Sequence, residues 1–481
     1  MFNKVLIANR GEIALRILCA CKELGLQTVA IYSQADRHSL HVRFADEAIC
    51  IGPPALARSY LHIPAIVSAA EITGAGAIHP GYGLLSENAH FAEVCETRGI
   101  KFIGPPAEVV RMMGEKQKAR AAMQRAGVGI IRGSEGIVEN EGEALEWARS
   151  LGFPLLVKAS AGGGGRGMRV VRDRFELPEL FRQARAEAQA AFGNGDLYLE
   201  QFLPRPRHIE FQVLGDSYGN VVSLGERECS IQRRHQKLIE ESPSVKMTPE
   251  LRATTGRQLE KTLGALGYVN AGTVEFLMNP EGALFFIEMN ARIQVEHPIT
   301  EMVTGVDLVK AQIRIAMGDR VESALRGPVR LHGHAMECRI NAEHPQSFTP
   351  SAGMITAFSL PGGIGVRVDT AAYQGAVIPP HYDSLIAKLV VRGADRQEAL
   401  SRMERALDMF IVGGIHTSIP LHRRILADPD FRCGNIHTEF MERFMPTSRK
   451  WVGEETPAAQ PGVLPGSELF RLLRTDLLQN Q

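Results

Sequence analysis

AGTVEFLMNPEGALFFIEMN (residues 271–290) holds two apolar runs around a turn, and this pattern predicts a β-hairpin. Pro at the second position and Gly at the fourth position of residues 279–282 are a strong turn signal. With a four-residue loop, we expect Glu275 opposite Phe286, and Glu288 two residues further along the same face, within about 7–8 Å of Glu275. The opposite face is expected to be core, with these members: Val274, Phe276, Phe285, Ile287 and Met289.

The alternation continues beyond the hairpin. If the chain stays extended, five polar side chains project from one face: Glu288, Asn290, Arg292, Gln294 and Glu296. A solvated amphipathic strand is the alternative, although a strand that faces water is usually rich in Thr and Lys. Two carboxylates and an amide oxygen are hard donors that suit magnesium better than zinc or copper. The pattern therefore favours a functional site.

A glycine-rich segment, SAGGGGRG at residues 160–167, lies between two β-like runs and follows Lys158. Consecutive N–H groups without Cβ atoms can form a concave nest for phosphate oxygens. The segment is not a Walker loop, because GK[ST] is missing and a strand follows it. A flexible hairpin loop is the other interpretation.

The N-terminal segment predicts strand, helix and strand over about residues 5–32, which is a parallel unit of an α/β domain. Its turn, residues 9–12, lacks the GxGxxG dinucleotide fingerprint. Long antiparallel strands are expected from about 204 to 297, and a mixed region with a helix near 396–407 follows. The predicted fold class is therefore α/β, with α+β character in the middle of the chain.

Bulk composition limits the function classes. Lys+Arg and Asp+Glu both number 54, so no global field attracts nucleic acid or an anionic membrane. At roughly 150 residues per domain, the length predicts about three domains. The seven cysteines form no CxxC pair and indicate reduced, buried thiols. No apolar run approaches the roughly eighteen residues that cross a bilayer, so we expect a cytoplasmic protein.

Five motifs together resemble the biotin carboxylase family of ATP-grasp enzymes. They are IANRGEIALR (7–16), HPGYGLLSEN (79–88), GGGGRGM (162–168) with the preceding Lys158, QRRHQK (232–237) and EMNARIQVEH (288–297). The resemblance runs from residue 1 to about 445. It implies a Rossmann-like domain (1–114), an ATP-grasp domain (115–330) with a mobile lid (about 131–203), a mixed C-terminal domain (331–446) and a tail (447–481).

The resemblance also implies site residues. The nucleotide would be held by Lys116, Lys158, Gly163, Gly164, Gly165, Gly167, Met168, Glu200, Leu203, His208, Gln232, His235 and Leu277. Magnesium, or manganese, would be held by Glu275, Glu288 and Asn290. Bicarbonate would lie on Lys237, Arg292 and the Val295 backbone, and the biotin ureido ring near Tyr82, Gln294 and Arg339.

The implied chemistry is the ATP-dependent carboxylation of carrier-bound biotin. Glu296 would act as general base on bicarbonate, which attacks the γ-phosphorus of ATP to give carboxyphosphate. This decomposes to carbon dioxide and phosphate, and phosphate can take the N1 proton of biotin. Arg339 would stabilise the enolate oxygen of the ureido group, since arginine is always charged and has fixed donors.

The family also implies partners. No Ala-Met-Lys-Met biotin-attachment sequence occurs, so the biotin carrier and the carboxyltransferase are expected on separate chains. Arg16, Glu23 and Arg367 match a dimer contact of the family, whereas Cys19 and Ile364 replace the Arg and Phe of some bacterial members. A homodimer is therefore expected. The final carboxyl acceptor is left open.

Three further interpretations stay open. In the tail, Ser467 is expected to cap an apolar helix that docks a partner subunit, with fraying as the alternative. Another ATP-grasp ligase, such as a carbamoyl-phosphate or purine-carboxylating enzyme, is disfavoured by ECRINAE at residues 337–343. A non-catalytic nucleotide-binding regulatory subunit is disfavoured because every chemical group of the site is present.

Overall fold

The structure, a computed structural model, describes residues 2–160, 167–325 and 327–445, except for the side chains of residues 116 and 117. Inter-residue contacts divide the chain into Met1–Arg443 and Phe444–Gln481, and the elements below lie in the first of these, except for the last residue of the final 3₁₀ helix, Phe444. The predicted tail helix and the glycines at positions 163–165 lie outside the described residues.

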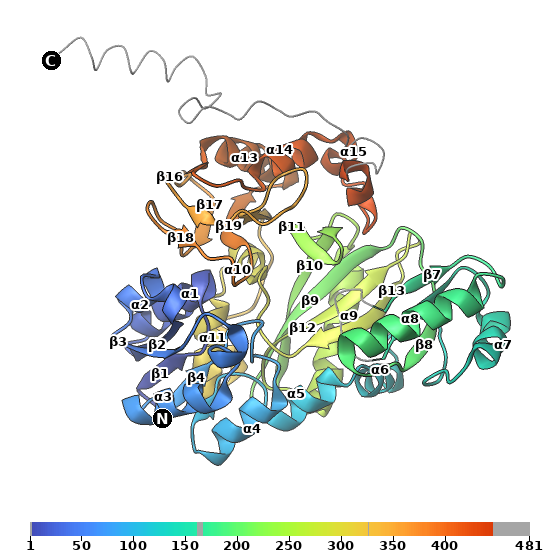
Figure 1. Cartoon of the computed structure of the whole chain (residues 1–481), viewed down its shortest axis with the longest axis horizontal. Coiled ribbons are helices and arrows are strands. Elements are labelled where there is room, and N and C mark those ends of the chain that lie inside the picture. The colour runs from blue at the N-terminus through green and yellow to red at the C-terminus, as the bar shows by residue number, and fades with distance from the viewer. Residues whose placement is uncertain (1, 161–166, 326, 446–481) are drawn as a thin grey trace, which may run out of the picture. The chain divides into compact units, whose positions relative to one another are not determined.

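Five parallel strands form the first sheet, in the order β3-β2-β1-β4-β5 (Figure 1). The strands are β1 (Lys4–Ile7), β2 (Gln27–Ser33), β3 (Glu47–Gly52), β4 (Ala77–His79) and β5 (Lys101–Phe102). The neighbouring helices are α1 (Gly11–Glu23), α2 (Leu40–Phe44), α3 (Ile63–Thr73), α4 (Ala89–Thr97) and α5 (Ala107–Gly114), with short 3₁₀ helices η1 (Gln34–Asp36) and η2 (Leu56–Arg58). Residues 5–7 are fully buried between two apolar clusters, which is why they read as one unbroken apolar run. The predicted parallel unit is confirmed.

An antiparallel sheet of eight strands occupies the centre, in the order β13-β12-β9-β10-β11-β14-β19-β17. The strands are β9 (Arg207–Gly215), β10 (Val221–Arg233), β11 (Gln236–Ser242), β12 (Asn270–Met278), β13 (Leu284–Asn290), β14 (His334–Asn341), β17 (Val366–Thr370) and β19 (Leu385–Gly393). Associated helices are α6 (Lys116–Arg125), α9 (Pro249–Ala265), α10 (His297–Thr304), α11 (Leu308–Ala316) and α12 (Val321–Leu325). The pairing of β11 with β14 makes one continuous sheet from strands that lie about a hundred residues apart in the chain.

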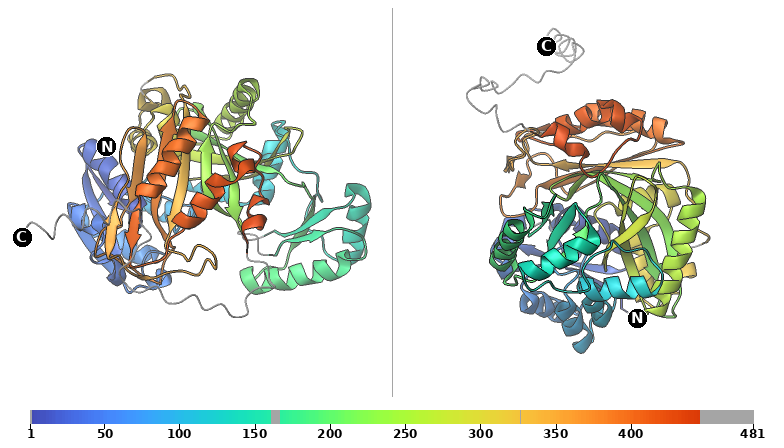
Figure 2. Two further views of the ribbon diagram at one scale, coloured as in Figure 1. Left: turned by 90° about the horizontal axis from the view of Figure 1, so that it is seen from above. Right: turned by 90° about the vertical axis from the view of Figure 1, so that its right-hand side faces the viewer.

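A smaller three-stranded sheet, β7-β6-β8, lies within the predicted lid. Its strands are β6 (Leu155–Ala159), β7 (Arg169–Val171) and β8 (Leu197–Gln201), and its helices are α7 (Glu141–Leu151) and α8 (Leu177–Phe192). These elements share an apolar core of their own, which includes Leu155, Val157 and Phe181. In Figure 2 this teal and green part of the chain stands to one side of the large sheet.

The β12–β13 hairpin differs from the predicted register. Met278 pairs with Leu284, which leaves a five-residue loop, and a further irregularity brings Glu275 directly opposite Glu288. The expected pairing of Glu275 with Phe286 is therefore wrong, and Phe286 pairs with Phe276 in the core. The expected core positions Phe285 and Ile287 are only half-buried, because the extra residue reverses the facing of this part of the strand.

The remaining elements belong to the C-terminal part of the chain, after β14. They are α13 (Arg396–Met409), α14 (Ile419–Ala427), α15 (Pro429–Arg432), η3 (Phe440–Phe444), and the strand pairs β15 (Gly353–Met354) with β18 (Val377–Ile378) and β16 (Ala357–Ser359) with β20 (Ile411–Gly413). Helix α13 begins where Asp395 accepts a hydrogen bond from the Glu398 N–H, as an N-cap should. Among the described residues, no helix is both long and apolar enough to span a bilayer.

Candidate active site

Lys237 is the centre of a buried charge cluster on the face of the large sheet. Its ammonium donates to Glu210 at 2.5 Å, to Glu296 at 2.5 Å and to Glu275 at 3.3 Å. Burial alone would lower the pKa of Lys237, but the three carboxylates, Glu210 first, raise it well above its usual value. The ammonium therefore stays positively charged and joins carboxylates from two strands and one turn.

Glu296 lies between two cations. Oε1 accepts from Lys237 at 2.5 Å and Oε2 accepts from Arg339 at 2.8 Å, while Arg339 Nε donates to Glu240 at 2.6 Å. Burial opposes ionisation of Glu296, yet Lys237, Arg339 and Arg227 outweigh it and hold its pKa well below the usual range. Burial raises the pKa of Glu240, and the charge of Arg339 only partly offsets this. The predicted base and the predicted ureido-binding arginine are thus in direct contact.

The segment after β13 brings the alternating polar residues together. Asn290 Nδ2 and Gln294 Nε2 both donate to Glu275 Oε1, at 2.7 and 2.9 Å. Arg292 donates to Asn290 Oδ1 at 3.0 Å, to Gln294 Oε1 at 2.8 Å and to Glu87 Oε2 at 2.7 Å. The strand ends at Asn290, so the expectation of an extended strand through residue 296 is wrong, but its side chains still converge because hydrogen bonds with Glu275 and Arg292 join them.

The donor set of the predicted metal site fits a magnesium ion. Glu275 and Glu288 are direct cross-strand partners, so their side chains leave the same face of the hairpin. Asn290 adds an amide oxygen two residues beyond Glu288. Oxygen-only donors with two negative charges match magnesium or manganese. These three residues could hold the ion, and it would supply charge neutralisation for a phosphate.

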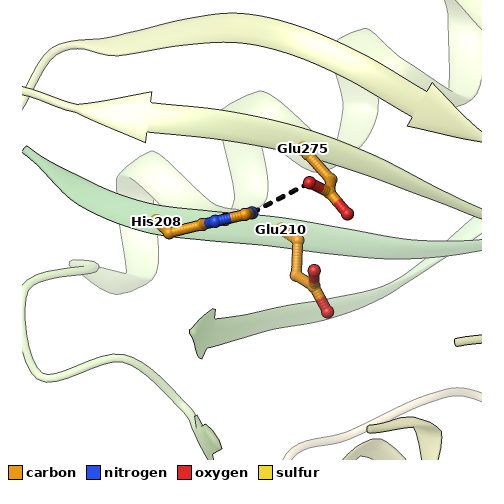
Figure 3. Close-up of side chains that lie close together, drawn as sticks. All are labelled: His208, Glu210 and Glu275. Carbon is orange, nitrogen blue, oxygen red and sulfur yellow. Dashed lines mark ion pairs between the residues drawn. The ribbon is translucent and has the colours of Figure 1, made fainter. Parts of the chain in front are cut away.

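A second group of potential ligands, His208, Glu210 and Glu275, lies close by (Figure 3). His208 Nε2 and Glu275 Oε2 are 3.0 Å apart. However, the ammonium of Lys237 already contacts both Glu210 and Glu275. Because Glu210 already has two cationic partners, Lys237 and Arg227, only Glu275 of this group is assigned to the metal site.

Several predicted nucleotide residues form two contact groups, one on the smaller sheet and one on the large sheet. Lys158 on β6 pairs with Glu200 on β8 at 3.0 Å, and Arg120 on α6 binds the other oxygen of Glu200. Burial would lower the pKa of Lys158, but Glu200 outweighs it and raises the pKa. On the large sheet, Gln232 Nε2 lies 3.4 Å from His208 Nδ1. The cationic pair Lys158 and Arg120 and the polar pair Gln232 and His208 therefore belong to different parts of the fold.

For the other predicted nucleotide residues, we give the position of each in the fold. Leu277 lies on β12 opposite His208, and His235 lies at the exposed two-residue turn between β10 and β11, with φ of 65°. Gly167 and Met168 precede β7, and Leu203 follows β8. Lys116 is the first residue of α6, and its side chain is outside the described part of the chain.

Tyr82 enters the site from the loop after β4. Its hydroxyl donates to Glu12 Oε1, which lies in the first turn of α1. Burial, and then the charge of Glu12, raise the pKa of Tyr82 well above its usual value, so the phenol stays protonated. The carboxyl ends of β1 and β4 thus supply this wall, at the edge where parallel α/β sheets bind ligands.

Sequence reasoning missed several carboxylates that contact the predicted site residues. Glu210 and Glu240 are fully buried partners of Lys237 and Arg339, and Glu87 holds Arg292. A signal existed for Glu210, because His208, Glu210 and Gln212 alternate along one strand in RHIEFQVLG (207–215). Glu87 lies inside the HPGYGLLSEN motif. Glu240 carries no comparable signal, since its partner is almost a hundred residues away.

Sequence profiles of known families cover most of the chain. The profile of the biotin carboxylase N-terminal domain matches residues 1–110, and that of the biotin carboxylase C-terminal domain matches residues 337–443. Between them, residues 115–324 match the ATP-binding domain described for the carbamoyl-phosphate synthase L chain. The ATP-binding domain of this chain is therefore flanked on both sides by domains of the biotin carboxylase type.

Individual proteins agree with the profiles. A biotin carboxylase of a Nostoc species is 55% identical over 442 residues, which span 92% of this chain and 99% of the relative. The biotin carboxylase of Haemophilus influenzae is 54% identical over 444 residues, with 92% of this chain and 99% of the relative covered. A crystal structure of the Hydrogenobacter thermophilus 2-oxoglutarate carboxylase biotin carboxylase domain dimer, in complex with MgADP, ADP and bicarbonate, is 52% identical and has a TM-score of 0.87, covering 92% of this chain and 98% of that one.

Proposed function

The chain belongs to the biotin carboxylase family and carboxylates biotin with ATP and bicarbonate, and we propose that its buried charge cluster divides this reaction among particular residues. Bicarbonate lies on Lys237, Arg292 and the Val295 N–H. Glu296 takes the bicarbonate proton, and the freed oxygen attacks the γ-phosphorus with ADP as leaving group. The single observation that carries the proposal is the direct contact of Glu296 with both Lys237 and Arg339.

Glu296 needs its neighbours to change before it can act as a base. A carboxylate whose pKa is held low by neighbouring cations accepts protons poorly. When bicarbonate enters, its negative charge draws hydrogen bonds from Lys237 and Arg292. When biotin enters, its ureido oxygen draws Arg339. Each rearrangement removes positive charge from Glu296 and raises its proton affinity, so the base becomes active only with substrates present.

Arg339 then serves the second half of the reaction. Carboxyphosphate gives carbon dioxide and phosphate, phosphate takes the N1 proton of biotin, and N1 attacks the carbon of carbon dioxide. The ureido oxygen gains negative charge as N1 loses its proton, and the guanidinium beside it stabilises that charge. Tyr82 and Gln294 orient the ring. Because this environment is buried, the hydrogen bonds act with little screening by water.

On the nucleotide side, we propose that Lys158 binds phosphate oxygens while Met168 and Leu277 pack against the adenine. His208, Gln232 and His235 hold the ribose and neighbouring polar atoms, and Lys116, Glu200 and Leu203 complete the pocket. Glycines 163–165 and 167 contribute backbone N–H groups to the phosphates. The part of the chain at 131–203 closes as a lid, which excludes water from the reactive intermediate.

The domain and partner assignments are part of the same proposal. The chain divides into a Rossmann-like domain (1–114), an ATP-grasp domain (115–330), a C-terminal domain (331–446) and a tail (447–481) that docks a partner subunit. The enzyme acts in the cytoplasm as a homodimer, with a separate biotin carrier and carboxyltransferase. All seven cysteines are free thiols, in keeping with a reducing compartment, although Cys19, Cys50 and Cys433 are exposed and not buried as expected.

The test is ADP release from ATP, magnesium and bicarbonate, with and without free biotin, for wild type and Arg339→Ala. Wild type should show biotin-stimulated release. In Arg339→Ala this stimulation should fall by about a hundredfold or more, because the variant loses the charge that stabilises the ureido oxygen. Arg98→Ala, which removes an exposed arginine paired with Glu71, is the control and should match wild type. Release that ignores biotin in the wild type would contradict the proposal.

A further inference from the structure

Lys388 is a lysine in the middle of a buried apolar strand. It lies on β19 within the run LIAKLVV (385–391), and its exposed fraction is 0%. An ammonium without partners in such a place would cost several kcal/mol. The contacts of this side chain must therefore account for its presence.

Those contacts come from three separate elements. The Lys388 ammonium donates to the Val295 carbonyl at 3.0 Å and pairs with Glu12 Oε2 at 3.0 Å, while Asp369 Oδ2 lies at 3.8 Å. Val295 precedes α10, Glu12 lies on α1 and Asp369 lies on β17. Lys388 is also the direct cross-strand partner of Arg339, so both side chains leave the same face of the sheet.

One contact leads to the bicarbonate side of the site. The Val295 carbonyl belongs to the peptide unit that joins Val295 to Glu296. Glu296 carries the proposed base, and the Val295 N–H is a proposed ligand of bicarbonate. This stretch is a turn without strand pairing, between the end of β13 and the start of α10. The hydrogen bond from Lys388 therefore fixes a backbone unit that no sheet holds in place.

The other contact leads to the biotin side. Glu12 uses one carboxylate oxygen for Lys388 and the other for the Tyr82 hydroxyl. Tyr82 also presents its ring to the Lys388 ammonium, with 5.9 Å between the nitrogen and the ring centroid. The lysine, the carboxylate and the phenol thus form a chain that ends at the residue proposed to orient the ureido ring.

We propose that Lys388 is a positioning residue for both small substrates, an inference that rests on the proposed function. Its ammonium holds the Val295–Glu296 peptide for bicarbonate and, through Glu12, holds Tyr82 for biotin. Lys388 itself contacts no reacting atom. Because a shift of about 1 Å in such a geometry can cost about a hundredfold in rate, a buried anchor for both walls has a large effect.

The test compares Michaelis constants for three substrates in Lys388→Met, which keeps most of the side-chain length and removes the ammonium group. We expect KM for bicarbonate and KM for biotin each to rise about tenfold or more. KM for ATP should stay within about twofold, since the nucleotide residues that the structure describes are not among the contacts of Lys388. Lys22→Met, at an exposed lysine on the same helix as Glu12, is the matched control and should leave all three constants unchanged. Thermal unfolding and circular dichroism establish that each variant folds.

Two results would overturn the inference. One is a folded Lys388→Met whose KM values for bicarbonate and biotin equal those of wild type. The other is a parallel rise of all three constants, which would indicate general loss of structure. If Lys388→Met does not fold, Glu12→Gln tests the same inference. This variant keeps a hydrogen-bond acceptor for Tyr82 but loses the ion pair with Lys388. An unchanged KM for biotin in Glu12→Gln would refute the positioning role of Lys388. A wild type without biotin-stimulated turnover would instead refute the proposed function.

Discussion

Glu288 and Glu275 play different parts in the site although they are cross-strand partners. Glu275 is tied to Lys237, Asn290 and Gln294, and Lys237 is the main reason that its pKa stays below the usual range against the effect of burial. Removing the Glu275 charge would disturb the whole cluster. We test metal binding at Glu288, because its substitution leaves these three hydrogen bonds of Glu275 in place.

We therefore predict that Glu288→Gln weakens magnesium binding about tenfold or more, since the site loses one of its two negative charges while keeping its shape. The measurement is the magnesium dependence of ADP release at saturating ATP. Glu281→Gln, at an exposed position in the turn of the same hairpin, should behave as wild type. Equal magnesium dependence in both variants would remove Glu288 from the metal site.

At the scale of elements, Glu241 joins three parts of the C-terminal half. It lies on β11 and accepts from His334 on β14 at 2.8 Å and from Arg396, the first residue of α13, at 2.7 Å. Burial would raise the pKa of Glu241, but the hydrogen bond from His334 and the charge of Arg396 lower it from 4.5 to about 2. A depressed carboxylate pKa stabilises the folded state above the unfolded-state pKa and loses that effect as the pH falls toward the folded-state pKa.

We predict that Glu241→Gln destabilises the fold by about 3 kcal/mol at pH 7, because each pKa unit of the shift from 4.5 to about 2 corresponds to about 1.4 kcal/mol. The difference from wild type should be constant from pH 7 to pH 5.5 and should shrink by about 1 kcal/mol at pH 3.5, because the wild-type carboxylate loses its advantage there. Urea midpoints at the three pH values measure this. Glu404→Gln, which breaks a more exposed ion pair with Arg432, should cost about 0.5 kcal/mol or less. A difference that does not change with pH would show that the loss is steric.

The hairpin at 271–290 shows which structural features the alternation of polar and apolar residues can predict. Alternation placed Glu275 and Glu288 on one face correctly, but it could not place the bulge. The register is set by packing: Phe286 meets Phe276 edge-to-face, with ring centroids 6.3 Å apart, and Phe276 meets Phe211 at 5.9 Å. That aromatic row selects Phe286 for the core, and the chain accommodates it with one extra residue.

The partners of the catalytic charges were less predictable than the charges themselves. Motifs identified Arg339 and Glu296, but Glu240 and Lys388 reach the site only because β11, β14 and β19 are neighbours in one sheet. Strands so distant in sequence carry no local signal of their pairing. A lysine within LIAKLVV was a visible anomaly, yet its partners on α1 and before α10 could not be inferred from the strand alone.

At the scale of the whole molecule, the residues expected at a dimer contact are largely engaged within the chain. Arg16 pairs with Glu301 at 2.8 Å and with Asp307 at 2.6 Å, and Arg367 pairs with Glu301 at 2.6 Å. Ile364 differs, because its side chain is 84% exposed just before β17. Since the charges already have partners, an apolar contact at Ile364 is the part of the proposed interface that a substitution can test alone.

We predict that Ile364→Glu raises the dimer dissociation constant by about tenfold or more, because a carboxylate would be buried at the contact without a partner. Sedimentation velocity over a concentration series measures this. Ile72→Glu on α3 is the matched control, since Ile72 is 79% exposed and the substitution is the same. Equal dissociation constants for the two variants would place the contact elsewhere on the surface. A wild type that sediments as a monomer at every concentration would refute the homodimer itself, and the biotin-stimulated activity of that monomer would then show that a single chain holds a complete site.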